Sequence, residues 1–155
     1  MKPMRLAVGG DHAGYPLREP VIRKLTEWGH AVRQVGPWTP EPVDFPDVAQ
    51  ALCRLVVSGE VERGIMICGT GVGASIAANK IPGIRAAVCH DLYSARQCVE
   101  HDDVNVLCLG AQIVGEFMAL ELIRTFLSAR FSSEEEFRRR VRKLEEMDRL
   151  REQRP

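Results

Sequence analysis

The stretch ICGTGVGASIAANK, residues 67–80, shows the strand–turn–helix unit from which the fold of this chain is predicted. It joins the end of an apolar run to a helical pattern through three alternating glycines, which places Cys68 at the carboxyl end of a strand, just before a helix. Backbone N–H groups at such a turn can converge on an anion, and the helix dipole favours negative charge there. A thiol in this setting is expected to have a lowered pKa and to act as a base or nucleophile.

The rest of the chain repeats this unit of a strand followed by a helix. Apolar runs predict strands at residues 4–10, 30–36, 64–68, 84–89 and 105–110. The third run has no polar alternation, as expected of a strand that is covered on both faces. We therefore expect an α/β fold, in which helices cover both faces of an open five-stranded parallel sheet and ligands bind beyond the carboxyl ends of the strands.

Composition limits the class of protein. The 155 residues are 45% hydrophobic, which predicts one globular domain over residues 1–155, and 21 basic residues balance 21 acidic ones. No net charge attracts nucleic acid or an anionic membrane, and we find no apolar run of membrane-spanning length and no signal-peptide pattern. The five cysteines have no C-x-x-C spacing, so we expect buried free thiols, no metal and a reducing cytoplasmic compartment.

The segment at residues 131–155 differs from the rest in its high charge and is expected to form a helical extension. Ser133 with Glu136 matches a capping box at the start of this helix. A narrow apolar stripe runs along it at Phe137, Val141, Leu144 and Met147. The stripe either docks on its own domain or packs on a second subunit, and we favour the second subunit.

Polar residues follow the first strand, in the segment GGDHAG at residues 9–14. Asp11 either caps the following turn or binds sugar hydroxyls, and His12 is a candidate for contact with an anion. The segment departs from the G-x-G-x-x-G pattern, which argues against a dinucleotide site. The proline-rich loop at residues 36–47 is a candidate rim for the site.

Two further side chains each have a structural and a functional interpretation. His101 stands near a helix end, where an imidazolium favours the helix dipole, although it is also suited to proton transfer near neutral pH. Taken alone, its position favours the structural role. Thr70 fits a tight turn, and its hydroxyl would point into the same pocket as Cys68.

Three segments together resemble the ribose-5-phosphate isomerase B family, which includes the galactose-6-phosphate isomerase subunits. They are AVGGDHAGYPLRE (7–19), ICGTGVGASIAANKIPGIRAAVCHDLYSARQ (67–97) and EHDDVNVLCLGAQIVG (100–115). The resemblance implies a Rossmann-like three-layer sandwich with no nucleotide, cofactor or metal. It also implies a homodimer, or in some members a homotetramer, with an active site shared between two subunits. The implied reaction is aldose–ketose isomerisation of a sugar phosphate through a cis-enediolate.

The same resemblance implies roles for the glycine turn. Cys68 corresponds to the thiol base that moves a proton between C1 and C2 of the open-chain sugar. The amides of Gly69, Gly71 and Gly73 would hold the developing oxyanion, and Thr70 would lie near the carbonyl or ring oxygen.

Residues outside the turn complete the implied site. His101 of the second subunit would open the furanose ring, and Asp11 and His12 would contact a hydroxyl and the phosphate. Asp102 stands where the family often has Asn, beside the site histidine. Arg140 corresponds to one of two phosphate-binding arginines on the last helix, and Arg138 and Arg139 beside it are alternative candidates for the missing one.

Two phosphate ligands of the family are replaced. Gln112 and Glu136 stand where arginine is common. Each change removes a charge-assisted contact to a dianion. Either Glu136 points away from the pocket, or the substrate has shifted from the default pair, ribose 5-phosphate and ribulose 5-phosphate. A shifted substrate would be a tetrose 4-phosphate, a hexose 6-phosphate or a sugar with a weaker anion. The alternative from another class is a non-catalytic module that binds phosphorylated sugars.

Overall fold

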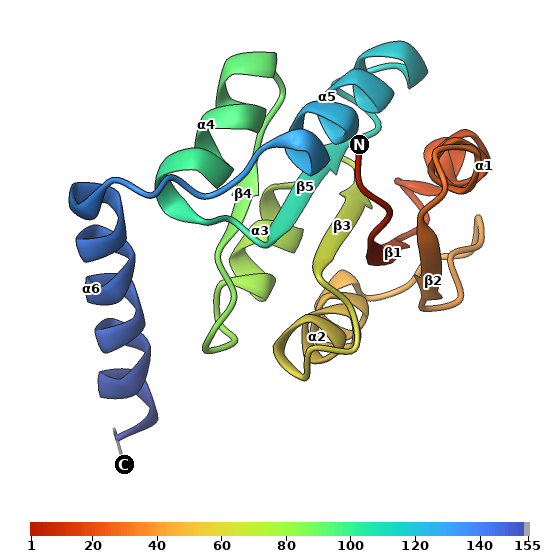
Figure 1. The fold of residues 1–155 in the computed structure, drawn as a ribbon. Helices are drawn as coiled ribbons and strands as arrows, with labels where there is room; N and C mark the ends of the chain where they lie inside the picture. The colour runs from red at the N-terminus through yellow and green to blue at the C-terminus, as the bar shows by residue number, and fades with distance from the viewer. Residues whose placement is uncertain (154–155) are drawn as a thin grey trace.

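The computed structural model describes residues 1–153 and contains one all-parallel sheet, in the strand order β2-β1-β3-β5-β4 (Figure 1). The strands are β1 (Arg5–Gly10), β2 (Ala31–Val35), β3 (Arg63–Cys68), β4 (Ala86–Val88) and β5 (Val106–Gly110). Each lies within about two residues of its predicted position. The predicted five-stranded α/β fold is confirmed.

Helices cover both faces of the sheet, as predicted for a three-layer sandwich (Figure 1). The elements are the short 3-10 helix η1 (Tyr15–Leu17) and the helices α1 (Arg18–Glu27), α2 (Phe45–Val57), α3 (Val72–Ala78), α4 (Leu92–Asp102), α5 (Glu116–Ser128) and α6 (Glu135–Glu152). The core on one face includes residues of α1, α4 and α5, and the core on the other includes residues of α2 and α3. None of the helices in residues 1–153 is both long enough and apolar enough to cross a bilayer.

The central strand β3 is buried on both sides, and its side chains alternate between the two layers. Ile65 and Ile67 pack in the core of α1, α4 and α5, whereas Met66 and Cys68 pack in the core of α2 and α3. Burial of each isoleucine side chain contributes about 1.5–3 kcal/mol. The two isoleucines therefore help fix the strand so that the Cys68 side chain faces the α2 and α3 layer.

The order of the strands opens a crevice between β1 and β3. The chain passes from β1 to the neighbouring β2 and then returns to β3 on the other side of β1. The loops that follow β1 and β3 therefore leave toward opposite faces, which is the point where doubly wound sheets bind their ligands. Because Gly10 pairs with Ile67, Asp11 and Cys68 leave the sheet side by side at this point.

The start of α6 differs from the predicted capping box. The helix begins at Glu135 after Glu134, and no side chain caps it, so the predicted pairing of Ser133 with Glu136 is wrong. The reason is a contact distant in sequence: the backbone N–H of Ser132 donates to the Glu100 carbonyl at 2.9 Å. This bond ties the segment before α6 to the end of α4 and sets where the helix can begin.

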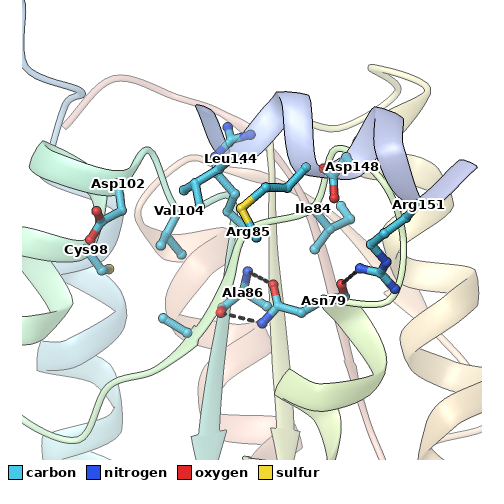
Figure 2. Close-up of a pocket in the computed structure, with 12 residues that line it drawn as sticks. Asn79, Ile84, Arg85, Ala86, Cys98, Asp102, Val104, Leu144, Asp148 and Arg151 are labelled. Carbon is cyan, nitrogen blue, oxygen red and sulfur yellow. Dashed lines mark hydrogen bonds between the residues drawn. The ribbon is translucent and has the colours of Figure 1, made fainter. Parts of the chain in front are cut away.

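Helix α6 docks on its own domain at two places along its length. In its first half Val141 is buried. Near its carboxyl end the Asp148 carboxylate accepts from the Gly83 N–H at 2.9 Å, and Arg151 donates to the Asn79 carbonyl at 2.9 Å (Figure 2). Between these contacts lies a hollow of about 360 Å³ that Leu144 lines. Residues 154 and 155, the end of the predicted extension, lie outside the described residues.

The predicted apolar stripe is only partly covered by these contacts. Val141 is buried, but Leu144 and Met147 are 41% and 60% exposed. Docking on the chain's own domain is therefore observed, and packing of the remaining stripe on a second subunit stays a prediction.

Arg63 joins the sheet to the end of α5, and we expect this contact to stabilise the fold. Its guanidinium donates to the carbonyls of Phe126 and Ala129 and lies 5.0 Å from the centre of the Phe126 ring. We expect Arg63→Met to lower the free energy of unfolding by about 1.5–3 kcal/mol per lost charged hydrogen bond, measured by urea denaturation. The control is Arg33→Met, which breaks an exposed ion pair with Glu60. It should change the free energy of unfolding by less than about 1 kcal/mol. Equal effects of the two variants would contradict this assignment.

Candidate active site

A pocket of about 280 Å³ opens at the carboxyl edge of the sheet, between the loops that follow β1 and β3. Six of the predicted site residues line it together: Asp11, Cys68, Gly69, Thr70, Gly71 and Gly73. In residues 1–153, no three His, Cys, Asp or Glu side chains form a group that could hold a metal ion. The pocket therefore offers a thiol, a carboxylate, a hydroxyl and backbone groups to a small polar ligand.

Cys68 is almost buried, with 5% of its surface exposed, and it borders the pocket. Burial raises the pKa of its thiol to about 12, and the nearby Asp11 carboxylate adds to the rise. A hydrogen bond from the Asp11 backbone N–H lowers the pKa, but by less. The expected lowering of the Cys68 pKa is therefore wrong for the single chain, because loss of solvation outweighs the turn that surrounds the sulfur.

Asp11 is held beside Cys68 by the turn that it caps. Its Oδ1 accepts from the backbone N–H groups of Ala13 and Gly14, each at 3.0 Å, and the residue is 6% exposed. The predicted capping role is confirmed, and it also fixes the carboxylate at the edge of the pocket. His12 is exposed and accepts at Nδ1 from the Val43 N–H at 3.3 Å, which joins it to the proline-rich loop.

The glycine turn owes its shape to Gly71. Gly71 immediately precedes α3 with a φ of +82°, in the left-handed region that favours glycine. A Cβ at this position would also lie 3.1 Å from the Leu109 carbonyl carbon. The Thr70 hydroxyl accepts from the Val72 N–H at 3.3 Å, so Thr70 stabilises the turn while it also lines the pocket.

Sequence reasoning did not place Phe45 in the pocket, and it described Gln112 only as a departure from a phosphate ligand. A Cβ on Gly73 would lie 2.6 Å from Phe45 Cζ, so the aromatic ring covers this glycine closely. The Gln112 side chain reaches Gly69 in the same way, with Oε1 2.9 Å from a Cβ built there. Phe45 stands in the loop predicted as a rim, but no sequence signal indicated that its ring turns inward.

The remaining predicted residues lie away from the Cys68 pocket. Helix α4 returns antiparallel to the strands, and its eleven residues extend about 16 Å, so His101 near its end lies toward the amino edge of the sheet (Figure 1). Asp102 lines the hollow beneath α6, and Arg140 lies on α6 itself, with its guanidinium carbon 5.7 Å from the centre of the Phe137 ring. The chain therefore does not bring His101, Asp102 or Arg140 to its own Cys68.

The fold and the pocket define the class of protein: a doubly wound α/β protein with a small polar pocket beside a thiol. The chain belongs to the ribose/galactose isomerase family, whose sequence model matches residues 6–144. It is an aldose–ketose isomerase, as the resemblance predicted.

Individual relatives support this assignment. The chain is 43% identical over 127 residues to ribose-5-phosphate isomerase B of Escherichia coli (strain K12), covering 82% of this chain and 85% of that protein. It is 38% identical over 130 residues to D-erythrulose-4-phosphate isomerase of Pectobacterium atrosepticum, covering 83% and 85%. Ribose-5-phosphate isomerase B of Clostridium thermocellum superposes with a TM-score of 0.92 at 44% identity, covering 95% of this chain and 99% of that one.

The Asp11 carboxylate beside Cys68 is expected to control the pH at which the thiol ionises. Asp11→Asn removes the charge but keeps an oxygen that accepts the two turn hydrogen bonds. Because the carboxylate raises the Cys68 pKa, this variant should form the thiolate at lower pH than the wild type. The measurement is the pH profile of Cys68 alkylation by iodoacetamide, followed by mass spectrometry.

The control for this experiment is Asp148→Asn, which changes a carboxylate on α6 that contacts Gly83. Its alkylation profile should match that of the wild type. An unchanged profile for Asp11→Asn, or a move to higher pH, would contradict the electrostatic assignment.

Proposed function

We propose that this chain interconverts ribose 5-phosphate and ribulose 5-phosphate through a cis-enediolate formed in the Cys68 pocket. The observation that carries the proposal is the position of Cys68 beside Asp11 and the glycine turn, at the crevice of the sheet. The likeness to ribose-5-phosphate isomerase B of Escherichia coli supports ribose 5-phosphate as the default substrate.

Cys68 is the proposed base. Its sulfur takes the proton from one of the two reacting carbons, C1 and C2, and returns it to the other, and an enediolate forms between these two steps. The reactive form is the thiolate, which burial disfavours in the single chain. Cationic groups brought to the pocket on assembly would favour ionisation, and Arg140 of a second copy is the proposed source.

The glycine turn is the proposed oxyanion site. Backbone amides from Gly69 to Gly73 would stabilise charge that develops on the sugar oxygen, with the Thr70 hydroxyl beside them. Loss of one such donor costs about 100-fold or more in rate in enzymes that use this device.

The proposed enzyme is a homodimer, a state that also allows pairing into a homotetramer. The positions of Cys68 and His101 support it, because a site that uses both side chains needs a second copy of the chain. Apolar surface near the turn also supports it: Val72 and Ile76, one helical turn apart on α3, are 53% and 57% exposed. Five buried free thiols support a reducing compartment, the cytoplasm, as its location.

One observation favours a second candidate substrate. Gln112 borders the pocket where the family often has arginine, and no Lys or Arg is among the described residues that line it. A shorter tetrose 4-phosphate, as named for the Pectobacterium atrosepticum relative, or a hexose 6-phosphate would place its anion elsewhere. The replacement of that arginine by Gln112 also supports the alternative of a non-catalytic binding module.

Replacement of the proposed base tests the activity. Cys68→Ala should lower turnover of ribose 5-phosphate by about 100- to 10,000-fold, the usual contribution of general acid–base catalysis. The assay compares ribose 5-phosphate with a tetrose 4-phosphate and a hexose 6-phosphate. Cys53→Ala, which changes a buried thiol on α2, is the matched control and should keep its activity.

Three outcomes of this assay are informative. Full activity of Cys68→Ala would contradict the assignment of the base. Preferred turnover of another sugar phosphate would support the second candidate. A wild-type protein that binds these sugars but turns over none of them would support the binding module.

The shared site is tested by mixing two inactive variants. Cys68→Ala and His101→Ala are each expected to be nearly inactive. After mixing and reassembly in equal amounts, half of the dimers are hybrids, and each hybrid holds one site with both native side chains. Roughly a quarter of wild-type activity should return if the site combines two copies. No recovery, with hybrid dimers verified by mass spectrometry, would contradict a shared site.

A further inference from the structure

The imidazole of His101 is held on α4 by a neighbour one helical turn away. Gln97 Nε2 lies 2.7 Å from His101 Nδ1. An amide nitrogen only donates, so Nδ1 of the imidazole must accept this hydrogen bond with its lone pair. In the neutral ring the single proton then resides on Nε2, because the hydrogen bond at one nitrogen sets the state of the other.

The plane of the same ring is held from α6. Phe137 stacks on His101 with ring centres 3.9 Å apart and an angle of 11° between the planes. The guanidinium of Arg140 lies 5.7 Å from the centre of the Phe137 ring. Phe137 therefore contacts two side chains that the proposed function assigns to the shared site.

The stack is supported by the backbone on either side of it. The Ser132 N–H donates to the Glu100 carbonyl at 2.9 Å, which joins the segment before α6 to the residue that precedes His101. One turn beyond Phe137, Val141 is buried at 4% exposure. These contacts hold the first turns of α6 against the end of α4.

From this arrangement we propose that Gln97 and Phe137 are positioning residues, which orient the His101 ring and leave its Nε2–H as the group available to the sugar. The proposal rests on the proposed function in that His101 works in a second copy's site. It deepens that function by assigning the resting ring the role of hydrogen-bond donor at Nε2. A ring in this state cannot accept a proton at that atom.

The tautomer is tested directly by nitrogen-detected NMR of the histidines in the full-length protein. Spectra recorded at about pH 9, well above the usual imidazole pKa of about 6.5, report neutral rings. The wild type should show His101 with the proton on Nε2. Gln97→Glu replaces the donor with an acceptor and should move the proton to Nδ1. Arg96→Leu, an exposed change on the same helix, is the matched control and should leave the tautomer unchanged.

Kinetics then separate positioning from folding. Gln97→Glu should lower kcat by about tenfold or more with little change in KM, because the variant ring presents an acceptor in place of a donor. Phe137→Leu removes the stack and should move the ring proton signals of His101 downfield, with a loss of kcat. Phe137→Tyr keeps an aromatic ring and should restore both the signals and the rate.

The outcomes distinguish this proposal from the proposed function. A wild-type ring protonated on Nδ1, or a Gln97→Glu variant with an unchanged tautomer, would overturn the positioning proposal. The expected tautomer combined with full activity of His101→Ala would instead show that the positioning is right and the catalytic use of His101 is wrong.

Discussion

Burial of the Cys68 sulfur is the constraint on which the rest of this molecule depends. The residue ends a strand that is covered on both faces, so its side chain faces the α2 and α3 layer and little of it meets solvent. An ion is costly in such a place, and each unit of pKa corresponds to about 1.36 kcal/mol. The pocket must therefore gain favourable charge or hydrogen bonds whenever the sulfur ionises, and the glycine turn beside it is the nearest source.

Topology sets the second constraint. Parallel strands with returning helices send residues at strand ends and residues at helix ends to opposite edges of the sheet. Asp11 and Cys68 lie at one edge, and His101 lies toward the other, with α6 packed beside it (Figure 1). A single chain thus carries the two parts of the proposed active site at opposite edges of its sheet. Two copies related by a twofold axis would present each part to the other.

Much of this could be predicted from the sequence because the signals are local or repeated. Apolar runs located all five strands. The parallel sheet alone predicted that the site lies at the carboxyl ends of the strands. Three segments in register predicted the family. These features depend on residues close together in the chain.

The failures share a different cause. The cap at Ser133 was wrong because a bond to Glu100, distant in sequence, sets where α6 begins. The direction of the Cys68 pKa was wrong because it depends on how closely two helices cover the sulfur, which no local pattern encodes. The inward position of the Phe45 ring was not predicted for the same reason.

The docking of α6 has one more consequence, because its contacts with the connection before β4 set the helix beside a short edge strand. Ala86 and Ala87 of that strand line the hollow under the helix. Helix α6 therefore hinders a strand of another molecule from adding to this edge of the sheet, which disfavours edge-to-edge aggregation.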